Sequence, residues 1–289
     1  MGEAVFGQSR TGEGRGLERQ LVLRHGDLEL TATLHYPFGD NAANEEKKGA
    51  VLICHGFVGN RIGVDRLFVK TARAIASKGR FVLRFDYGGC GESSGDYGAL
   101  GFSSMIDQTR TALDYLLGMD CVDPSRVVLL GHSLGGAVAL HTAIKDKRVS
   151  RLVLWSAVAY PFNDIVRIVG RDQYDRAVIT GSADHAGYLL QPAFFESLQQ
   201  HQPFQAASRF NGDVLLVHGT SDDSIPADYS FLYQKLFWTR SEGQCDKEII
   251  FQADHTFSSF AHQQEAIRVT SSWIEKQEKS QEEWHHWSI

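Results

Sequence analysis

Cysteine and proline are scarce in this sequence. It holds 4 cysteines and 6 prolines in 289 residues, and the cysteines (Cys54, Cys90, Cys121 and Cys245) lie far apart with no CxxC pair. Widely spaced cysteines of this kind argue against a disulfide framework and against a thiolate metal site. Free thiols in a reducing compartment are the simpler interpretation, so we expect a cytoplasmic protein without a bound metal.

Long apolar runs and an excess of positive charge are also missing. No stretch reaches 18 consecutive apolar residues, and residues 1–20 lack the apolar segment of a signal peptide. Lys and Arg number 29 against 35 Asp and Glu, which gives a net charge of −6. We therefore expect no membrane span, and neither nucleic acid nor an anionic membrane as a partner. Nothing in the sequence decides the oligomeric state, and a homodimer is compatible with it.

Short apolar runs alternate along the chain with longer segments of helical periodicity. Most of these runs lack the apolar–polar alternation of a strand with one solvent face, which predicts strands buried on both faces. We predict strands at 50–54, 81–85, 126–130, 151–155, 214–217 and 248–251, and helices at 64–77, 104–117, 134–144, 228–237 and 263–278. Residues 19–23 and 28–36 predict an antiparallel hairpin at the N-terminal edge. This order is typical of an α/β fold with a mostly parallel sheet and helices on both faces.

One interval interrupts the alternation of strands and helices. Residues 158–210 contain no strand–helix unit, although they are too rich in aromatic and aliphatic side chains for a linker. Long insertions in compact domains are usually functional, and we predict a lid, with a small hairpin across 181–184. The chain then divides into a flexible N-terminal segment (1–18), one α/β domain (19–277) that holds the lid, and a polar C-terminal tail (278–289).

The stretch VVLLGHSLGG, residues 127–136, places a serine between a predicted strand and a predicted helix. Gly131-His132-Ser133-Leu134-Gly135 fits G-x-S-x-G, the motif in which a sharp turn presents a serine hydroxyl above the edge of a sheet. Glycine on both sides relieves the crowding at such a turn, and the start of the helix favours a developing negative charge. Ser133 is therefore the candidate nucleophile. An ordinary helix N-cap is the alternative.

A serine nucleophile needs a base, and the base needs an acid that orients it. Among twelve histidines we favour His255, because the stretch ADHTF follows a predicted strand and precedes the last helix. Asp222, in HGTSDDSIP after another strand, is the candidate acid, with Asp223 as the fallback. The chain order Ser133, Asp222, His255 is nucleophile, acid, base, the order found in α/β-hydrolases.

Two backbone N–H groups are the candidates for an oxyanion hole. One belongs to Leu134, directly after the nucleophile, and the other to Phe57, in HGFVG after the strand at 50–54. We expect His55 to buttress this loop through a hydrogen bond. We expect His132 to point away from the nucleophile, and His218 to pack or to form a hydrogen bond within its own loop.

An aromatic substrate pocket is predicted from one strand end and the lid. Its candidate residues are Trp155, Tyr160, Phe162, Tyr188 and Phe194. Packing of the lid on itself is at least as good an interpretation of each lid aromatic. The glycine pattern of a dinucleotide site and the lysine of a Walker motif are both missing, so no cofactor is expected.

The loop landmarks together resemble the α/β-hydrolase family over roughly residues 50–277. HGFVGN, FDYGGCGESSG, GHSLGG, HGTSDDSIP and ADHTF stand in the family's order, with the closest resemblance to its cinnamoyl/feruloyl esterase-like branch of serine carboxylesterases. The resemblance implies an eight-stranded, mostly parallel sheet with a lid between strands six and seven, and cofactor-free hydrolysis of carboxylic esters. It also implies that residues 86–93 shape the site without supplying a catalytic residue.

The resulting hypothesis is a serine carboxylesterase that acts through an acyl-enzyme on small to medium acyl or aromatic esters. A thioesterase or a serine peptidase with the same three residues is the first alternative, because the sequence does not show how well a leaving group is protonated. A non-catalytic α/β-hydrolase scaffold that binds a partner is the second. It is less favoured, because all three candidate catalytic residues are present.

Overall fold

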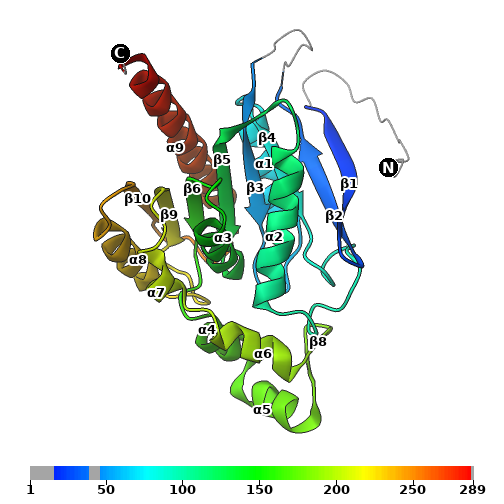
Figure 1. The fold of residues 1–289 in the computed structure, drawn as a ribbon. Helices are drawn as coiled ribbons and strands as arrows, with labels where there is room; N and C mark the ends of the chain where they lie inside the picture. The colour runs from blue at the N-terminus through cyan, green and yellow to red at the C-terminus, as the bar shows by residue number, and fades with distance from the viewer. Residues whose placement is uncertain (1–15, 39–45, 288–289) are drawn as a thin grey trace.

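The structure, a computed structural model, describes residues 16–38 and 46–287, with side chains described up to residue 280. An eight-stranded sheet forms its centre, in the order β1-β2-β4-β3-β5-β6-β9-β10 (Figure 1). The strands β3, β4, β5, β6, β9 and β10 pair in parallel, whereas β1 and β2 are antiparallel to their neighbours. The α/β class and the N-terminal hairpin are therefore confirmed. The expected flexible segment 1–18 lies almost entirely outside the described residues.

The strands of the sheet coincide with the predicted runs, most of which they extend by a few residues, whereas β2 and β10 each end one residue before the predicted end. Their bounds are β1 Glu18–His25, β2 Leu28–His35, β3 Lys48–Cys54, β4 Phe81–Phe85, β5 Val122–His132, β6 Arg151–Trp155, β9 Asp213–Gly219 and β10 Cys245–Ile250. The largest extension is in β5, which begins four residues before the predicted strand. The ends of β5 and β6, at which the candidate site residues were predicted, pair with each other as His132 and Trp155.

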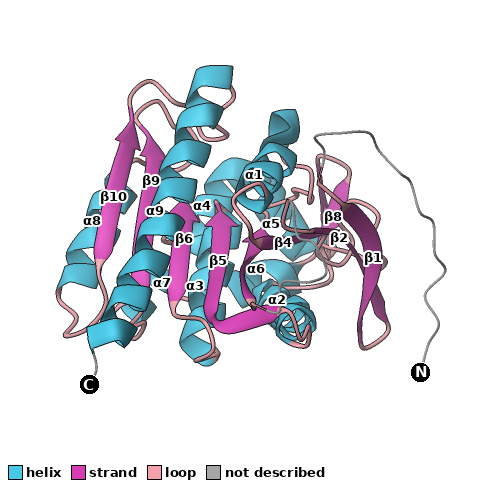
Figure 2. Ribbon diagram, turned by 90° about the horizontal axis from the view of Figure 1, so that it is seen from above, coloured by secondary structure: helices cyan, strands magenta, loops and turns pink. Residues whose placement is uncertain are grey.

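Helices cover both faces of the sheet (Figure 2). α1 Leu67–Ala76 and α9 Phe260–Trp287 lie on one face, and α2 Phe102–Leu117, α3 Leu134–Lys145 and α8 Asp228–Trp238 on the other. Successive side chains of β3 alternate between the two cores: Val51 and Ile53 pack with α1 and α9, whereas Leu52 and Cys54 pack with α2 and α3. Burial on both faces explains why the strands read as continuous apolar runs. In the described part of the chain, no helix combines the length and the apolar character needed to cross a bilayer.

Two predicted helices have different bounds in the structure. The helix predicted at 64–77 begins as a single 3-10 turn, Val64–Arg66, before α1 starts. Asp65 and Arg66 have φ of 51° and 63°, a left-handed conformation that an α-helix does not accept. The helix predicted at 263–278 continues to Trp287, through most of the segment expected as a polar tail. Glu, Gln and Lys are strong helix formers and no Gly or Pro follows, so nothing in the sequence ends the helix earlier.

The insertion between β6 and β9 forms a helical unit below the carboxyl edge of the sheet in Figure 1. It contains α4 Pro161–Val169, α5 Arg171–Thr180, β7 Ala183–His185, β8 Tyr188–Leu190, α6 Pro192–Gln199 and α7 Pro203–Ala207. The small hairpin exists, but its turn lies at 186–187 and not across 181–184. Gly181, with a φ of 90°, ends α5 in the left-handed conformation typical of a helix C-terminus.

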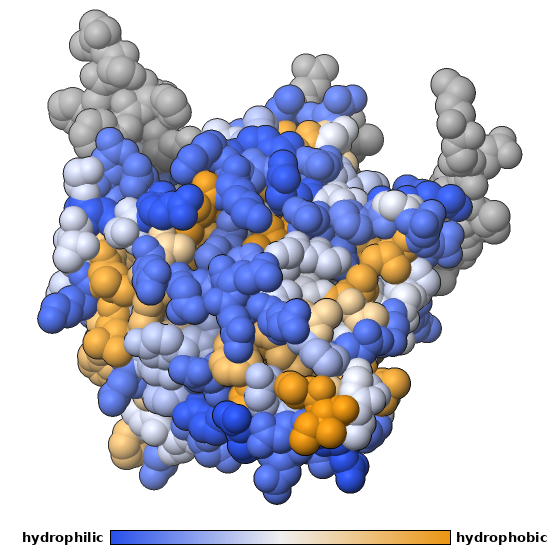
Figure 3. Space-filling model, turned by 60° about the horizontal axis from the view of Figure 1, so that its bottom comes forward, coloured by the Kyte–Doolittle hydropathy of each residue, from blue (hydrophilic) through white to orange (hydrophobic). Residues whose placement is uncertain are grey.

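The molecular face seen in Figure 3 is mainly hydrophilic, with apolar side chains in separate small areas.

Histidines inside the fold hold their neutral form. Burial lowers the pKa of His35 to about 4 and the pKa values of His132 and His141 to about 3. A histidine of the unfolded chain takes up its proton near pH ~6.5. The unfolded state therefore binds more protons than the folded state between about pH 6.5 and 4, and the free energy of unfolding falls as the pH is lowered through this window.

We predict that His141→Gln makes this loss of stability smaller. Because one histidine no longer titrates on unfolding, the drop in unfolding free energy between pH 6 and 5 should shrink by about 1 kcal/mol. Urea unfolding at each pH measures it, and above pH ~7.5 the two proteins should show the same pH dependence. Parallel stability curves from pH 6 to 5 would contradict the burial argument.

Candidate active site

Loops from four strands meet at the carboxyl edge of the parallel sheet. They follow β3, β5, β9 and β10, and parallel strands place such loops on one side of the sheet. Three of these loops and the start of α1 enclose a cavity of about 210 Å³. It is lined by Gly56, Phe57, Val58, Gly59, Asn60, Gly63, Val64, Leu67, Phe68, His132, Ser133, His255 and Thr256.

Ser133 occupies the sharp turn between β5 and α3. Its φ of 57° and ψ of −124° lie outside the regions that residues with a Cβ normally adopt, and its side chain opens on the cavity. Backbone hydrogen bonds hold this conformation: the N–H of Ser133 donates to Trp155 O at 2.9 Å, and the N–H of Val158 donates to Ser133 O at 3.1 Å. The hydroxyl makes no capping hydrogen bond to α3, which argues against the N-cap interpretation.

Glycines allow the backbone to pack tightly around this turn. A Cβ added to Gly135 would lie 2.3 Å from Cys54 O and 2.4 Å from His55 O, so α3 begins in contact with the backbone after β3. A Cβ added to Gly131 would lie 2.3 Å from Gly135 O. The glycines of the motif are therefore required by close contacts between backbone segments, and they bring the nucleophile loop against the loop that carries Phe57.

His255 and Asp222 form a hydrogen-bonded pair at the far side of the cavity. His255 Nδ1 lies 2.8 Å from Asp222 Oδ2, and the Asp222 side chain is completely buried. A carboxylate only accepts hydrogen bonds, so Nδ1 carries the proton and Nε2 keeps a free lone pair. Both His255 and Ser133 line the same cavity. The structure thus brings together the three residues selected as nucleophile, base and acid.

Asp222 receives more donors than His255 alone. His218 Nε2 donates to Asp222 Oδ2 at 3.1 Å, and the N–H groups of Ser224 and Ile225 donate to Oδ1 at 3.0 and 2.8 Å. Burial by itself would raise the pKa of Asp222, but the hydrogen bonds from His218 and His255 outweigh it and hold this pKa well below its usual value. The hydrogen bond expected for His218 within its loop is confirmed. Asp223, the fallback, is exposed and accepts a hydrogen bond from Ser224 Oγ.

The two candidate oxyanion donors lie on neighbouring segments. Leu134 is the first residue of α3, so its N–H belongs to the helix-end groups that intrahelical bonds leave unused. Phe57 stands in a turn closed by the N–H of Gly59, which donates to Gly56 O at 3.2 Å. His55 supports this turn as expected: its Nδ1 donates to Gly56 O at 2.9 Å, and its Nε2 accepts from the N–H of Tyr87 at 3.1 Å.

His132 has a contact that the sequence does not predict. Its Nε2 lies 2.8 Å from the backbone oxygen of His255, and the two rings lie 4.8 Å apart between centroids. Burial and the neighbouring His255 lower the pKa of His132 to about 3, so it is a neutral donor to this carbonyl. Residue 132 therefore holds the loop of His255 in place, across 123 positions of sequence.

None of the five aromatic residues predicted for the substrate pocket lines the 210 Å³ cavity. Trp155 is fully buried, and its Nε1 donates to Thr270 Oγ1 at 3.0 Å beneath the sheet. The four lid residues pack on other aromatic rings: Tyr160 on Phe204 and Tyr229, Phe162 on Tyr174, Tyr188 on Tyr97, and Phe194 on Phe57, Tyr97 and Phe195. Phe162 packs within the lid, as the alternative of a lid packed on itself predicts, whereas Tyr188 and Phe194 also contact rings of the loops outside the lid.

Part of the cavity wall comes from residues that the sequence analysis did not select. Val64, Leu67 and Phe68, from the 3-10 turn and α1, form its apolar part together with Phe57 and Val58. The only sequence signal for them was their position after HGFVGN, because the predicted helix at 64–77 gave no reason to place its first turn beside Ser133. Among the described residues, 16–38 and 46–287, no group of three or more His, Cys, Asp or Glu side chains could hold a metal ion.

The loop after β4 holds the loop of Phe57 in place through hydrogen bonds and ion pairs. Asp86 is fully buried and accepts hydrogen bonds from the N–H of Arg61 at 2.5 Å and from the Arg61 guanidinium. The same guanidinium pairs with Glu92 at 2.5 Å. Residues 86–93 therefore anchor the neighbouring loop from outside the cavity, as the family resemblance implies.

Comparisons with known proteins agree with this architecture. The model of a family described as alpha/beta hydrolase fold matches residues 49–177, which include Ser133 and end before Asp222. A solved structure of Est1E from Butyrivibrio proteoclasticus with ferulic acid bound superposes with a TM-score of 0.74 at 20% identity, covering 90% of this chain and 98% of that chain.

Two curated relatives share parts of the sequence. An uncharacterized 31.7 kDa protein of Escherichia coli is 30% identical over 131 residues, 45% of this chain and 44% of that protein. Palmitoyl-protein thioesterase ABHD10, mitochondrial, of Pongo abelii is 26% identical over 204 residues, 67% of this chain and 64% of that protein. The chain thus matches less than two thirds of the length of either relative. Sheet topology, the turn at Ser133 and the structural superposition show that the chain has the α/β-hydrolase fold, and the family match covers its residues 49–177.

We predict that Gly135→Ala strongly destabilises the protein. The new Cβ would meet two backbone oxygens at 2.3 and 2.4 Å, which cannot swing away as a flexible side chain would. The cost should be about 2 kcal/mol or more in the free energy of unfolding, measured by urea denaturation.

Gly118→Ala is the matched control for this variant. Gly118 caps α2 with a φ of −77°, which alanine accepts, and its nearest new contact is 3.2 Å from Asp114 O. Its unfolding free energy should stay within about 1 kcal/mol of the wild type. Equal stabilities of the two variants would mean that α3 does not pack against the β3 loop as described.

Proposed function

We propose that the protein is a serine carboxylesterase that hydrolyses small to medium acyl or aromatic esters through an acyl-enzyme. The observation that carries this proposal is the 2.8 Å hydrogen bond between His255 Nδ1 and Asp222, beside a cavity that also contains Ser133 at a strained turn. This arrangement supports the roles of nucleophile for Ser133, base for His255 and acid for Asp222.

The proposed reaction begins with transfer of the Ser133 proton to His255 Nε2 as the serine oxygen attacks the ester carbonyl carbon. The N–H groups of Phe57 and Leu134 bind the oxyanion of the tetrahedral intermediate. His255 then gives the proton to the departing alkoxide, the C–O bond breaks, and the acyl group stays on Ser133. Water deprotonated by His255 attacks this acyl-enzyme, and the acid leaves as the proton returns to the serine.

Asp222 keeps the base in the tautomer that this reaction needs. Its negative charge stabilises the imidazolium that forms in both steps, and the hydrogen bond to Nδ1 directs Nε2 toward the serine. His218 and two backbone N–H groups keep the carboxylate ionised despite its burial. His132 acts as a positioning residue through the backbone oxygen of His255.

The size of the cavity supports small substrates. Its volume of about 210 Å³ is below the ~300–1,000 Å³ of sites that enclose drug-sized ligands. Val64, Leu67 and Phe68 offer an apolar wall to an acyl or alcohol group. The ferulic acid bound to Est1E, a protein of the same fold, is in keeping with an aromatic acid as one such group.

A thioesterase is the second candidate. Its support is the 26% identity with a palmitoyl-protein thioesterase over 204 residues. The same three residues would serve a thioester, whose thiolate leaves more readily than an alkoxide. A palmitoyl chain would be difficult to accommodate, because the cavity is small and lid rings pack on one another.

We predict that Ser133→Ala lowers the rate of hydrolysis of p-nitrophenyl acetate by about 10³-fold or more, since no other group would form the acyl-enzyme. His255→Ala should lose a similar factor, and the double variant should lose no more than either single variant. Ser77→Ala, an exposed residue at the end of α1, is the control and should keep the wild-type rate. Wild-type activity in Ser133→Ala would place the nucleophile elsewhere.

The acyl chain length and the leaving group of the substrate distinguish the two candidate functions. We predict that kcat/KM for p-nitrophenyl acetate and butyrate exceeds that for the palmitate by about 10-fold or more, because the cavity of about 210 Å³ is too small for a palmitoyl chain. A tenfold difference corresponds to ~1.4 kcal/mol. Matched ester, thioester and anilide substrates of one acyl group should rank the ester first. A preference for palmitoyl thioesters would favour the second candidate, and a preference for the anilide would indicate a peptidase.

A further inference from the structure

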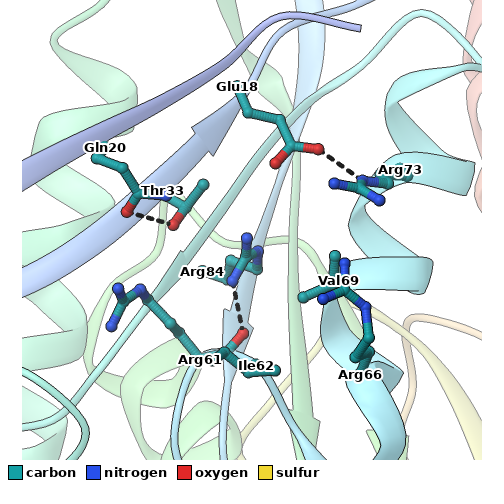
Figure 4. A pocket seen from close by; sticks show the side chains of 9 residues that line it. All are labelled: Glu18, Gln20, Thr33, Arg61, Ile62, Arg66, Val69, Arg73 and Arg84. Atoms are coloured by element: carbon teal, nitrogen blue, oxygen red, sulfur yellow. Dashed lines mark hydrogen bonds and ion pairs between the residues drawn. The ribbon is translucent and has the colours of Figure 1, made fainter. Parts of the chain in front are cut away.

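A second cavity lies on the other side of the loop that carries Phe57. Its volume is about 160 Å³, and four arginines contribute to its lining: Arg61 and Arg66 from the segment before α1, Arg73 from α1 and Arg84 from β4. Glu18 is the single acidic residue of the lining. Figure 4 shows Arg84 in the middle, with Glu18 above it and Arg66 and Arg73 to one side.

Two of the four arginines have their charge matched by carboxylates. Arg73 Nε lies 2.6 Å from Glu18 Oε1, and Arg61 pairs with Asp86 and Glu92. Within residues 16–38 and 46–280, for which side chains are described, Arg66 and Arg84 make no ion pair. Four arginines therefore stand against the three carboxylates Glu18, Asp86 and Glu92, which leaves one positive charge in excess.

The position of Arg84 makes this imbalance costly. Its residue is only 4% exposed, and its guanidinium donates to His35 Nε2 at 2.8 Å and to Arg61 O at 3.0 Å. Neither acceptor carries a charge, because burial and the nearby Arg84 lower the pKa of His35 to about 4. An arginine stays protonated at neutral pH, and a buried charge without an ion-pair partner destabilises a fold. Glu18 and Asp86 favour the charged form of Arg84 from nearby, but each is ion-paired with another arginine.

We propose that this arginine pocket binds a small soluble phosphate, either inorganic phosphate or the phosphoryl group of a short phosphate monoester. Arg84 and Arg66, the two arginines of the lining without an ion pair, supply charged donors, and Arg73 adds further N–H donors. The bound dianion offsets the buried charge of Arg84.

The arrangement of the donors favours a tetrahedral group over a planar carboxylate. Guanidinium groups approach from β4, from the segment before α1 and from α1 itself, so oxygens on several sides of a ligand would find donors. Gln20 and Thr33, hydrogen-bonded to each other at 3.0 Å, add polar groups on the wall formed by β1 and β2. Arg66 and Ile62 are exposed, which leaves the pocket open to solvent.

The pocket shares a wall with the catalytic cavity. Arg61, Ile62 and Arg66 face the arginine pocket, whereas Gly59, Asn60, Gly63 and Val64 of the same segment line the cavity of Ser133. A phosphate held by Arg66 therefore contacts the segment that forms one side of the candidate active site. The phosphate site takes no part in the ester chemistry, so the proposal of phosphate binding does not depend on the proposed function.

Titration calorimetry with inorganic phosphate at pH 7.5 and constant ionic strength tests the proposal. We expect one phosphate per chain, with binding weakened about 10-fold or more in Arg66→Gln, because the variant removes a charged donor to the phosphate. Arg66 is exposed, so this variant should fold. Arg24→Gln, which removes an exposed arginine of β1 paired with Glu29 outside the pocket, should bind like the wild type.

Three results would overturn the proposal. The first is no saturable binding up to about 10 mM phosphate, seen neither as heat nor as a rise in the thermal unfolding midpoint. The second is an equal loss of affinity in Arg24→Gln and Arg66→Gln, which would mean attraction to overall charge. The third is acetate bound as tightly as phosphate in the same assay, which would assign the pocket to carboxylates.

Discussion

The structure depends on the close packing of backbone against backbone at the turn of Ser133. The start of α3 lies against the chain after β3 so tightly that a single Cβ at residue 135 would sit 2.3 Å from Cys54 O. This contact fixes the strained φ of 57° at Ser133, and it brings the N–H of Leu134 and the loop of Phe57 to the same side of the serine. Strain at one residue is maintained because the neighbouring strands hold the surrounding backbone on several sides.

The two cavities on either side of the loop at 57–66 differ in how the buried charge beside each is compensated. On one side, Asp222 stays ionised despite its burial, since His255, His218 and two N–H groups donate to it. On the other side, Arg84 is buried with only neutral acceptors beside it. The same principle, that a buried charge needs partners, thus accounts for a preorganised acid in the first cavity and for an anion site in the second.

The sequence predicts the parts of this molecule that depend on local patterns. Apolar runs mark strands buried on both faces, and G-x-S-x-G, the aspartate loop and the histidine loop each follow such a run, so all three candidate catalytic residues could be selected. The contact of His132 with the carbonyl of His255 could not, because its partner lies 123 positions away. The place of Val64 at the cavity could not be predicted either, because the left-handed pair Asp65–Arg66 interrupts the helix expected there. The lid aromatics pack partly on one another and partly on Phe57 and Tyr97, and their role in a substrate pocket stays a prediction. The arginine pocket combines five segments and has no motif.

The most direct test of the central claim is labelling with a fluorophosphonate, followed by peptide mapping. A serine activated at this turn by His255 should take up one phosphonyl group per chain, located on Ser133, and the His255→Ala protein should remain almost unlabelled. Modification of another residue, or equal labelling with and without the imidazole, would contradict the account. So would a wild-type protein that stays unmodified, since the fold would then carry the three residues without their chemistry.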